Sequence, residues 1–244
     1  MAKNLRFDGK TAILTGAGGG IGSALAKTLT DLGYNLVMVG RSEEKLRRSA
    51  ENAGCADTAL ILPGDLTDGA FVDRIIPETL ARFGGLDLLV NNAGMLIAKP
   101  IEQTDRTELD AIMKTNVYAP YMLCRDALEP LRKSDCAAII NIGSVVSYVG
   151  YAEQTAYSAT KHALLGLTKA LANEVYKDGI RVHMIAPGGV DTPLADSVGH
   201  LDRSSAQLIA PEDIADLAEF LLTHRDTNAV IDEVRLHRIG KAPF

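Results

Sequence analysis

The stretch that decides the fold is TAILTGAGGGIGSALAKTLTDL, residues 11–32. It opens with an apolar run, Thr11 to Leu14, passes through a glycine cluster between Gly16 and Gly22, and continues with apolar residues at helical spacing. Glycines at such a turn permit positive φ and let backbone N–H groups approach an anion at the positive end of the helix dipole. Many glycine-rich turns are merely tight, so the stretch alone predicts a strand, a turn and a helix, with an anion site as one of two interpretations.

Apolar runs alternate with helical patterns along the rest of the chain. The predicted strands lie near Thr11–Thr15, Asn35–Gly40, Thr58–Leu62, Leu86–Asn91, Ala137–Gly143, Ile180–Ala186 and Ala229–Leu236. Most of these runs are continuously apolar, as expected of strands that are covered on both faces. The sequence therefore predicts an α/β fold, a doubly wound parallel sheet of about seven strands with helices on both faces, in one three-layer domain over residues 1–244.

Three side chains form the outline of a proton-transfer site. Tyr157 and Lys161 are four residues apart in a helix-forming stretch, so they share one face, and Ser144 ends an apolar strand upstream. An unperturbed phenol has a pKa of about 10, and a nearby cation favours the phenolate, so Lys161 is expected to lower the pKa of Tyr157. By itself the Tyr-x-x-x-Lys motif reads more simply as a surface pair on a helix.

Further motifs change that interpretation. They are the turn Thr15 to Gly22, Asp65-Leu66, Asn91-Asn92-Ala93-Gly94, Asn116 in Thr115-Asn116-Val117, then Ser144, Tyr157, Lys161 and Pro187-Gly188-Gly189-Val190-Asp191-Thr192. In order and spacing the chain resembles the short-chain dehydrogenase/reductase family, in its subfamily of about 250 residues with a single Rossmann-like domain. The resemblance spans nearly the whole chain.

The resemblance implies an oxidoreductase that interconverts a ketone or aldehyde carbonyl and an alcohol by hydride transfer, with Tyr157 as acid and base. Ser144 and Tyr157 would hold the substrate oxygen, and Lys161 would also bind the nicotinamide ribose. Asn116 would hold a water that links Lys161 to solvent. The residues implied to bind the coenzyme are Gly16, Gly18, Gly19, Gly20, Ile21, Gly22, Gly40, Arg41, Ser42, Asp65, Leu66, Asn91, Asn92, Ala93, Gly94, Tyr157, Lys161, Pro187, Gly188, Val190 and Thr192. The substrate is expected at Ser144, Val146, Tyr157, Met95, Tyr151 and Gly189, beside Leu96, Val145 and a lid near Leu194 to Gln207.

Some of these positions carry a structural alternative. Asp65 could contact the adenine amino group or cap a helix that begins near Thr67. The Asn91 to Gly94 segment is good turn chemistry as well as a coenzyme contact. Ser42 could cap the helix that opens at Glu43.

The coenzyme is expected to be NADP(H) in preference to NAD(H). An acidic residue at the end of the second strand would bind the ribose hydroxyls of NAD(H), whereas a nearby Arg accommodates a 2′-phosphate. Here Gly40 stands where that acidic residue is expected, and Arg41 follows it. The negative charges of Glu43 and Glu44 reduce the positive potential near Arg41.

Charge, cysteine content and the first residues indicate which partners and which compartment to expect. The net charge of −6 argues against a nucleic-acid or anionic-membrane partner. Three cysteines without metal-ligand spacing suit a reducing compartment, and the polar residues 1–10 lack a signal core, so a cytoplasmic protein is expected. No metal site is predicted. His162 and His183 are expected to be structural or on the surface, whereas His200 could face the substrate.

The substrate itself is not identified beyond a small carbonyl or alcohol compound. A 3-oxoacyl-thioester reductase is an alternative, which the Ile231 to Leu236 segment disfavours because it lacks that group's glycine-rich ending. A cofactor-sensing protein without turnover and an epimerase are further alternatives, although the chain keeps Tyr157 and Lys161 and lacks an epimerase's extra length. Apolar residues surround the helices near Val117–Leu131 and Thr155–Ala172, which predicts a homotetramer, or at least a homodimer.

Overall fold

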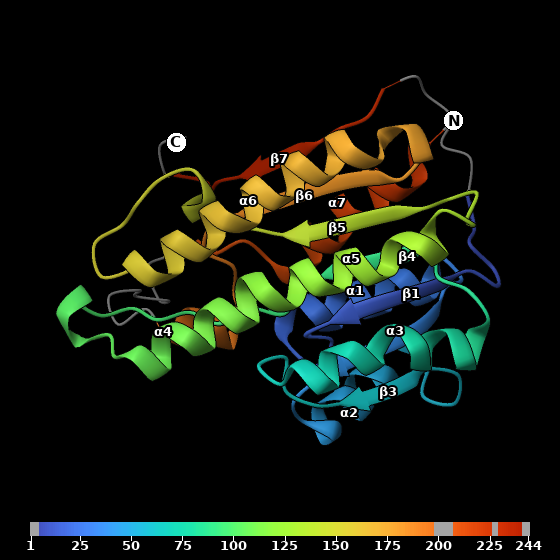
Figure 1. Cartoon of the computed structure of the whole chain (residues 1–244), viewed down its shortest axis with the longest axis horizontal. Coiled ribbons are helices and arrows are strands. Elements are labelled where there is room, and N and C mark those ends of the chain that lie inside the picture. Colours follow the sequence, from blue (N-terminus) through green and yellow to red (C-terminus); the bar gives the residue numbers. More distant parts are fainter. Residues whose placement is uncertain (1–4, 198–206, 226–228, 241–244) are drawn as a thin grey trace.

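The central sheet has the predicted strands in a parallel, doubly wound arrangement (Figure 1). The computed structural model describes residues 5–197, 207–225 and 229–240. Its strands are β1 (Thr11–Thr15), β2 (Asn35–Gly40), β3 (Leu60–Pro63), β4 (Leu88–Asn91), β5 (Ala138–Ile142), β6 (Arg181–Pro187) and β7 (Glu233–Leu236), in the order β3-β2-β1-β4-β5-β6-β7. The order reverses between β1 and β4, which places a ligand crevice at the carboxyl ends of these strands.

Helices cover both faces of this sheet, as predicted. The α-helices are α1 (Gly20–Asp31), α2 (Glu43–Ala53), α3 (Gly69–Phe83), α4 (Arg106–Met113), α5 (Ala119–Leu131), α6 (Thr155–Val175) and α7 (Pro211–Thr223). Shorter elements are the 3₁₀ turns η1 (Ile101–Gln103), η3 (Val145–Ser147), η4 (Tyr176–Asp178) and η5 (Pro193–Ser197) and the π-helical turn η2 (Lys114–Tyr118). Helices α1, α2 and α7 pack on one face, and α3, α5 and α6 pack on the other.

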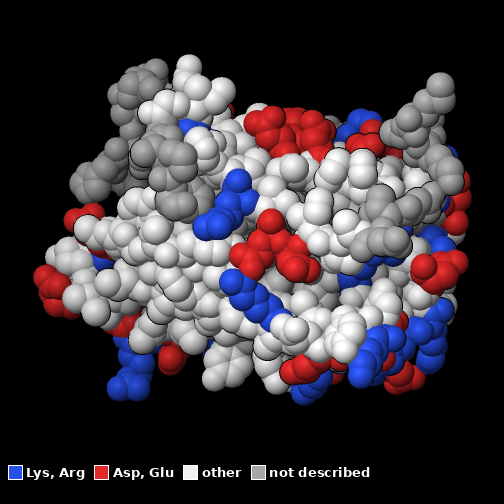
Figure 2. All heavy atoms as spheres, turned by 90° about the horizontal axis from the view of Figure 1, so that it is seen from above, with Lys and Arg blue, Asp and Glu red and all other residues white. Residues whose placement is uncertain are grey.

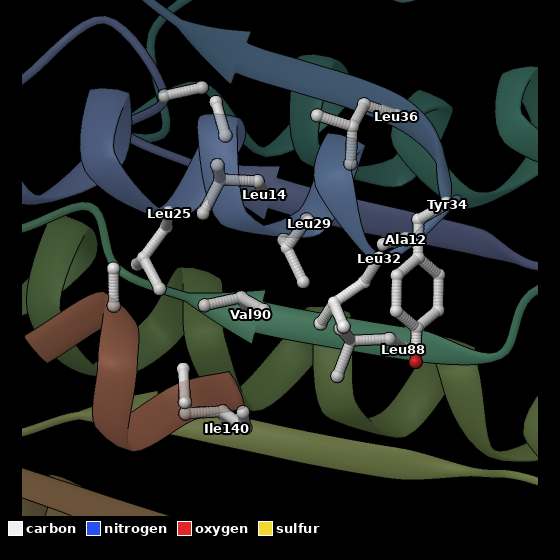
Figure 3. Close-up of a cluster of buried hydrophobic side chains, with 14 of the residues drawn as sticks. Ala12, Leu14, Leu25, Leu29, Leu32, Tyr34, Leu36, Leu88, Val90 and Ile140 are labelled. Atoms are coloured by element: carbon white, nitrogen blue, oxygen red, sulfur yellow. The ribbon is translucent and has the colours of Figure 1, made fainter. Parts of the chain in front are cut away.

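Alternate residues along the central strands point into two separate hydrophobic cores, one on each face of the sheet. In β1, Ala12 and Leu14 point into the cluster under α1, whereas Ile13 points into the opposite cluster. Figure 3 shows the first cluster, where Leu25 and Leu29 of α1 lie over the side chains of the central strands. All five of these side chains are fully buried, so hydrophobic burial on both faces explains why the strands are continuously apolar.

Three strands begin at least two residues later than the sequence predicts. The N–H groups of Thr58 and Ala59 bond to the Cys55 carbonyl in a turn, so β3 starts at Leu60. Strand β4 starts at Leu88 and not at Leu86. The last strand spans Glu233–Leu236 and not Ala229–Leu236, because it is an edge strand whose preceding described residues are exposed. None of these shifts changes the topology.

The glycine turn is locked against the turn that follows β4. The Thr15 hydroxyl accepts hydrogen bonds from the backbone N–H groups of Asn92 and Ala93, each at 3.0 Å. The Asn92 side chain donates back to the Thr15 carbonyl at 2.9 Å. Gly16 has φ +67°, and a Cβ there would lie 2.8 Å from the Ala93 Cα, so only glycine fits.

The outer surface carries mixed charge and several exposed aromatic side chains. On the face drawn in Figure 2, acidic and basic groups lie close together beside a broad uncharged area. Tyr118 in η2 and Tyr121 in α5 are 63% and 55% exposed, as expected if this side meets another copy, although the predicted assembly stays a prediction. Among the described helices, none combines the length and apolar character that crossing a membrane requires.

We predict that Gly22→Ala destabilises the fold. A Cβ at position 22 would overlap the Gly16 carbonyl oxygen, and backbone on both sides must then move. We expect a loss of at least about 2 kcal/mol in the free energy of unfolding, measured by urea titration, despite the better helix propensity of Ala.

Gly19→Ala is the matched control in the same turn. Its Cβ would meet only the Gly16 carbonyl oxygen, at 3.4 Å. Equal free energies of unfolding for the two variants would contradict the prediction that the close contact with the Gly16 carbonyl requires glycine at position 22.

Candidate active site

A cavity of about 480 Å³ opens at the carboxyl ends of β1, β4, β5 and β6. Its walls are formed by Ile21, Asn92, Gly94, Leu96, Ile142, Gly143, Ser144, Val145, Val146, Tyr151, Ala152, Gln154, Tyr157, Lys161, Pro187, Gly188, Gly189, Val190, Thr192, Leu194, Ala195, His237 and Arg238. The predicted site residues Ser144, Tyr157 and Lys161 therefore meet in one cavity, although Ser144 follows β5 and the other two lie on α6.

Each of the three side chains is held by its element. Ser144 follows β5 and caps η3, where its hydroxyl accepts from the Val146 N–H at 3.2 Å. Tyr157 and Lys161 lie on successive turns of α6 and are only 8% and 4% exposed. Lys161 Nζ donates to the Ile142 carbonyl at the end of β5, at 2.9 Å.

Burial moves the pKa values of both α6 groups away from their ordinary values. It raises the pKa of Tyr157 to about 12, partly opposed by a hydrogen bond from Ser144. Burial lowers the pKa of Lys161 to about 8 by desolvating its ammonium, and no carboxylate among the described residues of the cavity wall offsets this effect. The expectation that Lys161 lowers the pKa of Tyr157 is therefore wrong for this state of the protein. The ammonium lies 5.7 Å from the ring centroid and points to a backbone carbonyl.

Asn116 is a buried anchor in η2, between α4 and α5. Its Oδ1 accepts from the Met95 N–H, and its Nδ2 donates to the Met95 carbonyl, both at 2.8 Å. Nδ2 also donates to the Thr160 hydroxyl at 3.0 Å. The side-chain amide thus bonds to protein groups on α6 and after β4, and the water that the family resemblance implied for Asn116 stays a prediction.

The first turn of α1 fits the pyrophosphate of a dinucleotide. Gly19 precedes this turn without a side-chain cap, and no acidic residue lies in it. The backbone N–H groups of Gly20, Ile21 and Gly22 donate to no group among the described residues. Three open donors at the positive end of a helix form an anion site.

The other predicted coenzyme residues divide between the cavity wall and the neighbouring strand ends. Ile21, Asn92, Gly94, Pro187, Gly188, Val190 and Thr192 are in the wall, together with Tyr157 and Lys161. Gly16, Gly18, Gly19, Gly20, Gly22, Gly40, Arg41, Ser42, Asp65, Leu66, Asn91 and Ala93 are outside it, around the ends of β1 to β4. The predicted substrate residues Ser144, Val146, Tyr157, Tyr151 and Gly189 are in the wall, as are Leu96 and Val145.

Three of these predictions need correction. The Asn91 side chain is buried, donates to Asn141 Oδ1 at 2.9 Å and is not in the cavity wall, whereas Asn92, which was also predicted, is in the wall. Met95 is not in the wall, since its backbone is bound by Asn116. The Leu66 side chain packs into the core beneath α3, which leaves only its backbone for a ligand.

The structure also shows which side chains cap the two helices, while coenzyme contacts of Ser42 and Asp65 stay predictions. Ser42 is the N-cap of α2 and accepts from the Lys45 N–H at 3.3 Å. Asp65 is not the cap of α3, because Asp68 takes that position. The exposed Asp65 carboxylate instead accepts from the Thr67 N–H at 2.8 Å.

The histidines and carboxylates away from the cavity have other partners. His162 is exposed, whereas His183 is buried in β6 with Nδ1 at 2.7 Å from the Ile231 carbonyl. His200 and most of the expected lid lie outside the described residues. One group of possible metal ligands among the described residues, Asp87, Asp135 and Cys136, surrounds Lys10, which pairs with both carboxylates.

Sequence reasoning missed several wall residues, above all His237 and Arg238. They follow β7 and reach the cavity because the Gly188 N–H donates to the Leu236 carbonyl at 2.8 Å. Ile142, Gly143, Ala152 and Gln154 were also not predicted, whereas Leu194 and Ala195 belong to the expected lid. Only the position of Arg238 just beyond the last strand hinted at the site, because the carboxyl ends of parallel strands share one edge.

Comparison with known proteins identifies the family. Residues 10–202 match the family model described as short chain dehydrogenase. The chain belongs to this family. It is therefore an oxidoreductase of the short-chain dehydrogenase/reductase type.

Similar family members include named reductases. The 3-oxoacyl-[acyl-carrier-protein] reductase FabG of Salmonella typhimurium is 33% identical over 243 residues, which cover 97% of this chain and 98% of FabG. The structure of a 3-ketoacyl-(acyl-carrier-protein) reductase from Brucella melitensis complexed with NADH has a TM-score of 0.86 at 30% identity, covering 94% of this chain and 97% of that one. A metagenomic short-chain oxidoreductase in complex with NADP has a TM-score of 0.81 at 32% identity, covering 96% and 98%.

We predict that Asn116→Ala destabilises this short-chain dehydrogenase by about 2 to 4 kcal/mol. The change leaves the backbone N–H and carbonyl of Met95 without their partners in a buried place. Chemical denaturation monitored by circular dichroism measures the loss. Asn173→Ala, on the exposed side of α6, is the control and should change stability by less than about 0.5 kcal/mol. An Asn116→Ala protein as stable as wild type would contradict the anchor role.

Proposed function

We propose that this protein is an NADP(H)-preferring oxidoreductase that interconverts a ketone or aldehyde and an alcohol, with Tyr157 as the proton donor and acceptor. The observation that carries the proposal is the meeting of Ser144, Tyr157 and Lys161 in one cavity beside an open anion site at α1. Family membership supports the same reaction class. A bound nicotinamide would supply or accept the hydride.

Ser144 and Tyr157 hold the carbonyl oxygen of the substrate by hydrogen bonds. With a pKa of about 12, the Tyr157 phenol is protonated at neutral pH, so it can donate a proton to that oxygen as negative charge develops there. In the opposite direction Tyr157 must first lose its proton, so alcohol oxidation should become faster as the pH rises. The free protein is thus prepared for carbonyl reduction.

Lys161 has further N–H donors that can bind the coenzyme and a group beside the phenol. Its ammonium has three N–H donors, and the Ile142 carbonyl takes one of them. The remaining donors can bind a ribose hydroxyl or a water beside Tyr157. With a pKa of about 8, Lys161 can also give up a proton near neutral pH and restore the phenol after each turnover.

The preference for NADP(H) is supported by unpaired cations at the end of β2. Arg41 is exposed, and its guanidinium bonds to no described residue. Lys45 also lacks a side-chain partner in the described chain, and its Cβ lies beside Gly18 of the glycine turn. Glu43 is paired with Arg47 at 2.6 Å, so this carboxylate opposes a 2′-phosphate less than the sequence suggested.

A 3-oxoacyl-thioester reductase is the second candidate. Full-length similarity to FabG and to the Brucella melitensis reductase favours it. A role in sensing a coenzyme without turnover has less support, because Tyr157, Lys161 and Ser144 are all present. A panel of ketones, alcohols and 3-oxoacyl thioesters with NADPH fluorescence as the readout separates the three functions.

We predict that Tyr157→Phe lowers kcat by at least about 100-fold, since it removes the proton that the reaction needs. The ring stays in place, so the coenzyme dissociation constant and the melting temperature should change little. Steady-state kinetics on any substrate accepted by the parent enzyme measures the loss. Tyr176→Phe, 65% exposed at the far end of α6, should keep the kcat of the parent. A Tyr157→Phe enzyme with wild-type kcat would contradict the assignment of Tyr157 as the proton donor and acceptor.

We predict that Arg41→Ala lowers kcat/KM for NADPH by about tenfold or more and leaves that for NADH nearly unchanged, because it removes a charge-assisted contact to the 2′-phosphate. Arg48→Ala, on the exposed side of α2, is the control. Gly40→Asp combined with Arg41→Ala should favour NADH further, although a Cβ at position 40 lies 3.2 Å from Leu46 Cδ2 and that side chain must shift. A parent enzyme that already prefers NADH would contradict the proposal.

A further inference from the structure

The segment after β7 brings a guanidinium into the wall of the catalytic cavity. Strand β7 is tied down by its Glu233 carboxylate, which accepts from the Tyr148 hydroxyl at 2.5 Å and pairs with Lys169 at 3.0 Å. The Leu236 carbonyl then accepts from the Gly188 N–H. Arg238 therefore lies against Gly189, where a Cβ would be 3.6 Å from its Cδ and 3.8 Å from its Nε.

The side chain of Arg238 has no counter-charge among the described residues. It forms no ion pair or hydrogen bond with them, and none of the described residues in the cavity wall is acidic. Glu233, the nearest acidic residue along the chain among those described, is already engaged by Tyr148 and Lys169. Arg238 as a residue is also partly buried, unlike the exposed Arg41, Arg48 and Arg106, which have no side-chain partner among the described residues either. A partly desolvated cation without a partner is costly unless a ligand supplies the negative charge.

The other predicted substrate contacts in the described cavity wall are uncharged. Leu96, Val145, Val146 and Tyr151 are apolar or neutral, so an anion placed there has one cationic partner at Gly189 and another, Lys161, deep in the cavity. Lys161 is committed to the Ile142 carbonyl and the reacting end. Arg238 is then the group available to bind a second, remote part of the substrate.

We propose that Arg238 determines substrate specificity by binding the carboxylate of a small oxo acid or hydroxy acid, whose carbonyl or hydroxyl group reacts at Tyr157 and Ser144. The planar guanidinium matches a carboxylate with two parallel hydrogen bonds. This inference rests on the proposed oxidoreductase function and names its substrate class. The same chemistry could serve a phosphate of the coenzyme, and the experiment distinguishes these two sources.

The kinetic test compares 3-oxobutanoate and 4-oxopentanoate with their methyl esters, for the wild-type enzyme and for Arg238→Gln. We expect the wild-type enzyme to favour each acid over its ester in kcat/KM by at least about tenfold. In Arg238→Gln this ratio should fall to about one, through a higher KM for the acid, while KM for the coenzyme stays constant. Arg238→Lys should recover part of the preference. Arg82→Gln, at the end of α3, is the matched control and should keep the wild-type ratio.

A binding measurement does not depend on turnover. Butanoate should raise the melting temperature of the wild-type protein with coenzyme present, in a saturable way, whereas butanamide should not, and Arg238→Gln should lose the response. Wild-type preference for the esters, or an Arg238→Gln enzyme that keeps the acid preference, would overturn the inference. A higher KM for the coenzyme alone would assign Arg238 to the coenzyme and also overturn it. If no ketone or alcohol is turned over but butanoate still binds through Arg238, the proposed function fails and the anion site stands.

Discussion

The structure of the site depends on a buried ammonium without a carboxylate partner. Lys161 is held by one backbone carbonyl, that of Ile142, and this bond fixes α6 against the end of β5. A chain of hydrogen bonds between buried polar side chains also holds α6 against β5. Asn91 donates to Asn141, and Asn141 donates to Thr168 of α6, each at 2.9 Å. Buried polar groups that are bonded in this way specify one register between strands and helix.

That arrangement places Tyr157 where its proton is both retained and usable. The phenol shares the turns of α6 with Lys161 and bonds to Ser144, which follows the same strand end. Burial opposes ionisation of both groups, so the phenol stays neutral and the ammonium loses its proton more readily. A neutral phenol beside a desolvated ammonium suits a reaction in which the substrate oxygen takes up a proton as its carbon takes up a hydride.

Much of this could be predicted from the sequence, because local patterns encode it. The apolar strand runs, the glycine turn and the spacing of Tyr157 and Lys161 predicted the sheet and the meeting of these side chains at its carboxyl edge. The pKa directions could not be predicted, since they depend on desolvation, which only the packed structure reveals. The burial of the Asn91 side chain away from the cavity could have been inferred from strand alternation, as Asn91 shares the face of Leu89. Arg238 carries no motif, and its place in the cavity depends on how the chain leaves β7.

The central claim is that Lys161 is buried without an ion-pair partner among the described residues. The titration of its ammonium tests this claim most directly. Carbon-13 NMR of labelled lysine side chains, with the Lys161 resonance assigned by its absence in Lys161→Met, follows the charge of this one ammonium against pH. Because burial disfavours the charged form, the account predicts a midpoint near the pKa of about 8 in the free protein. A midpoint near 10.5, the ordinary value for lysine, would contradict it.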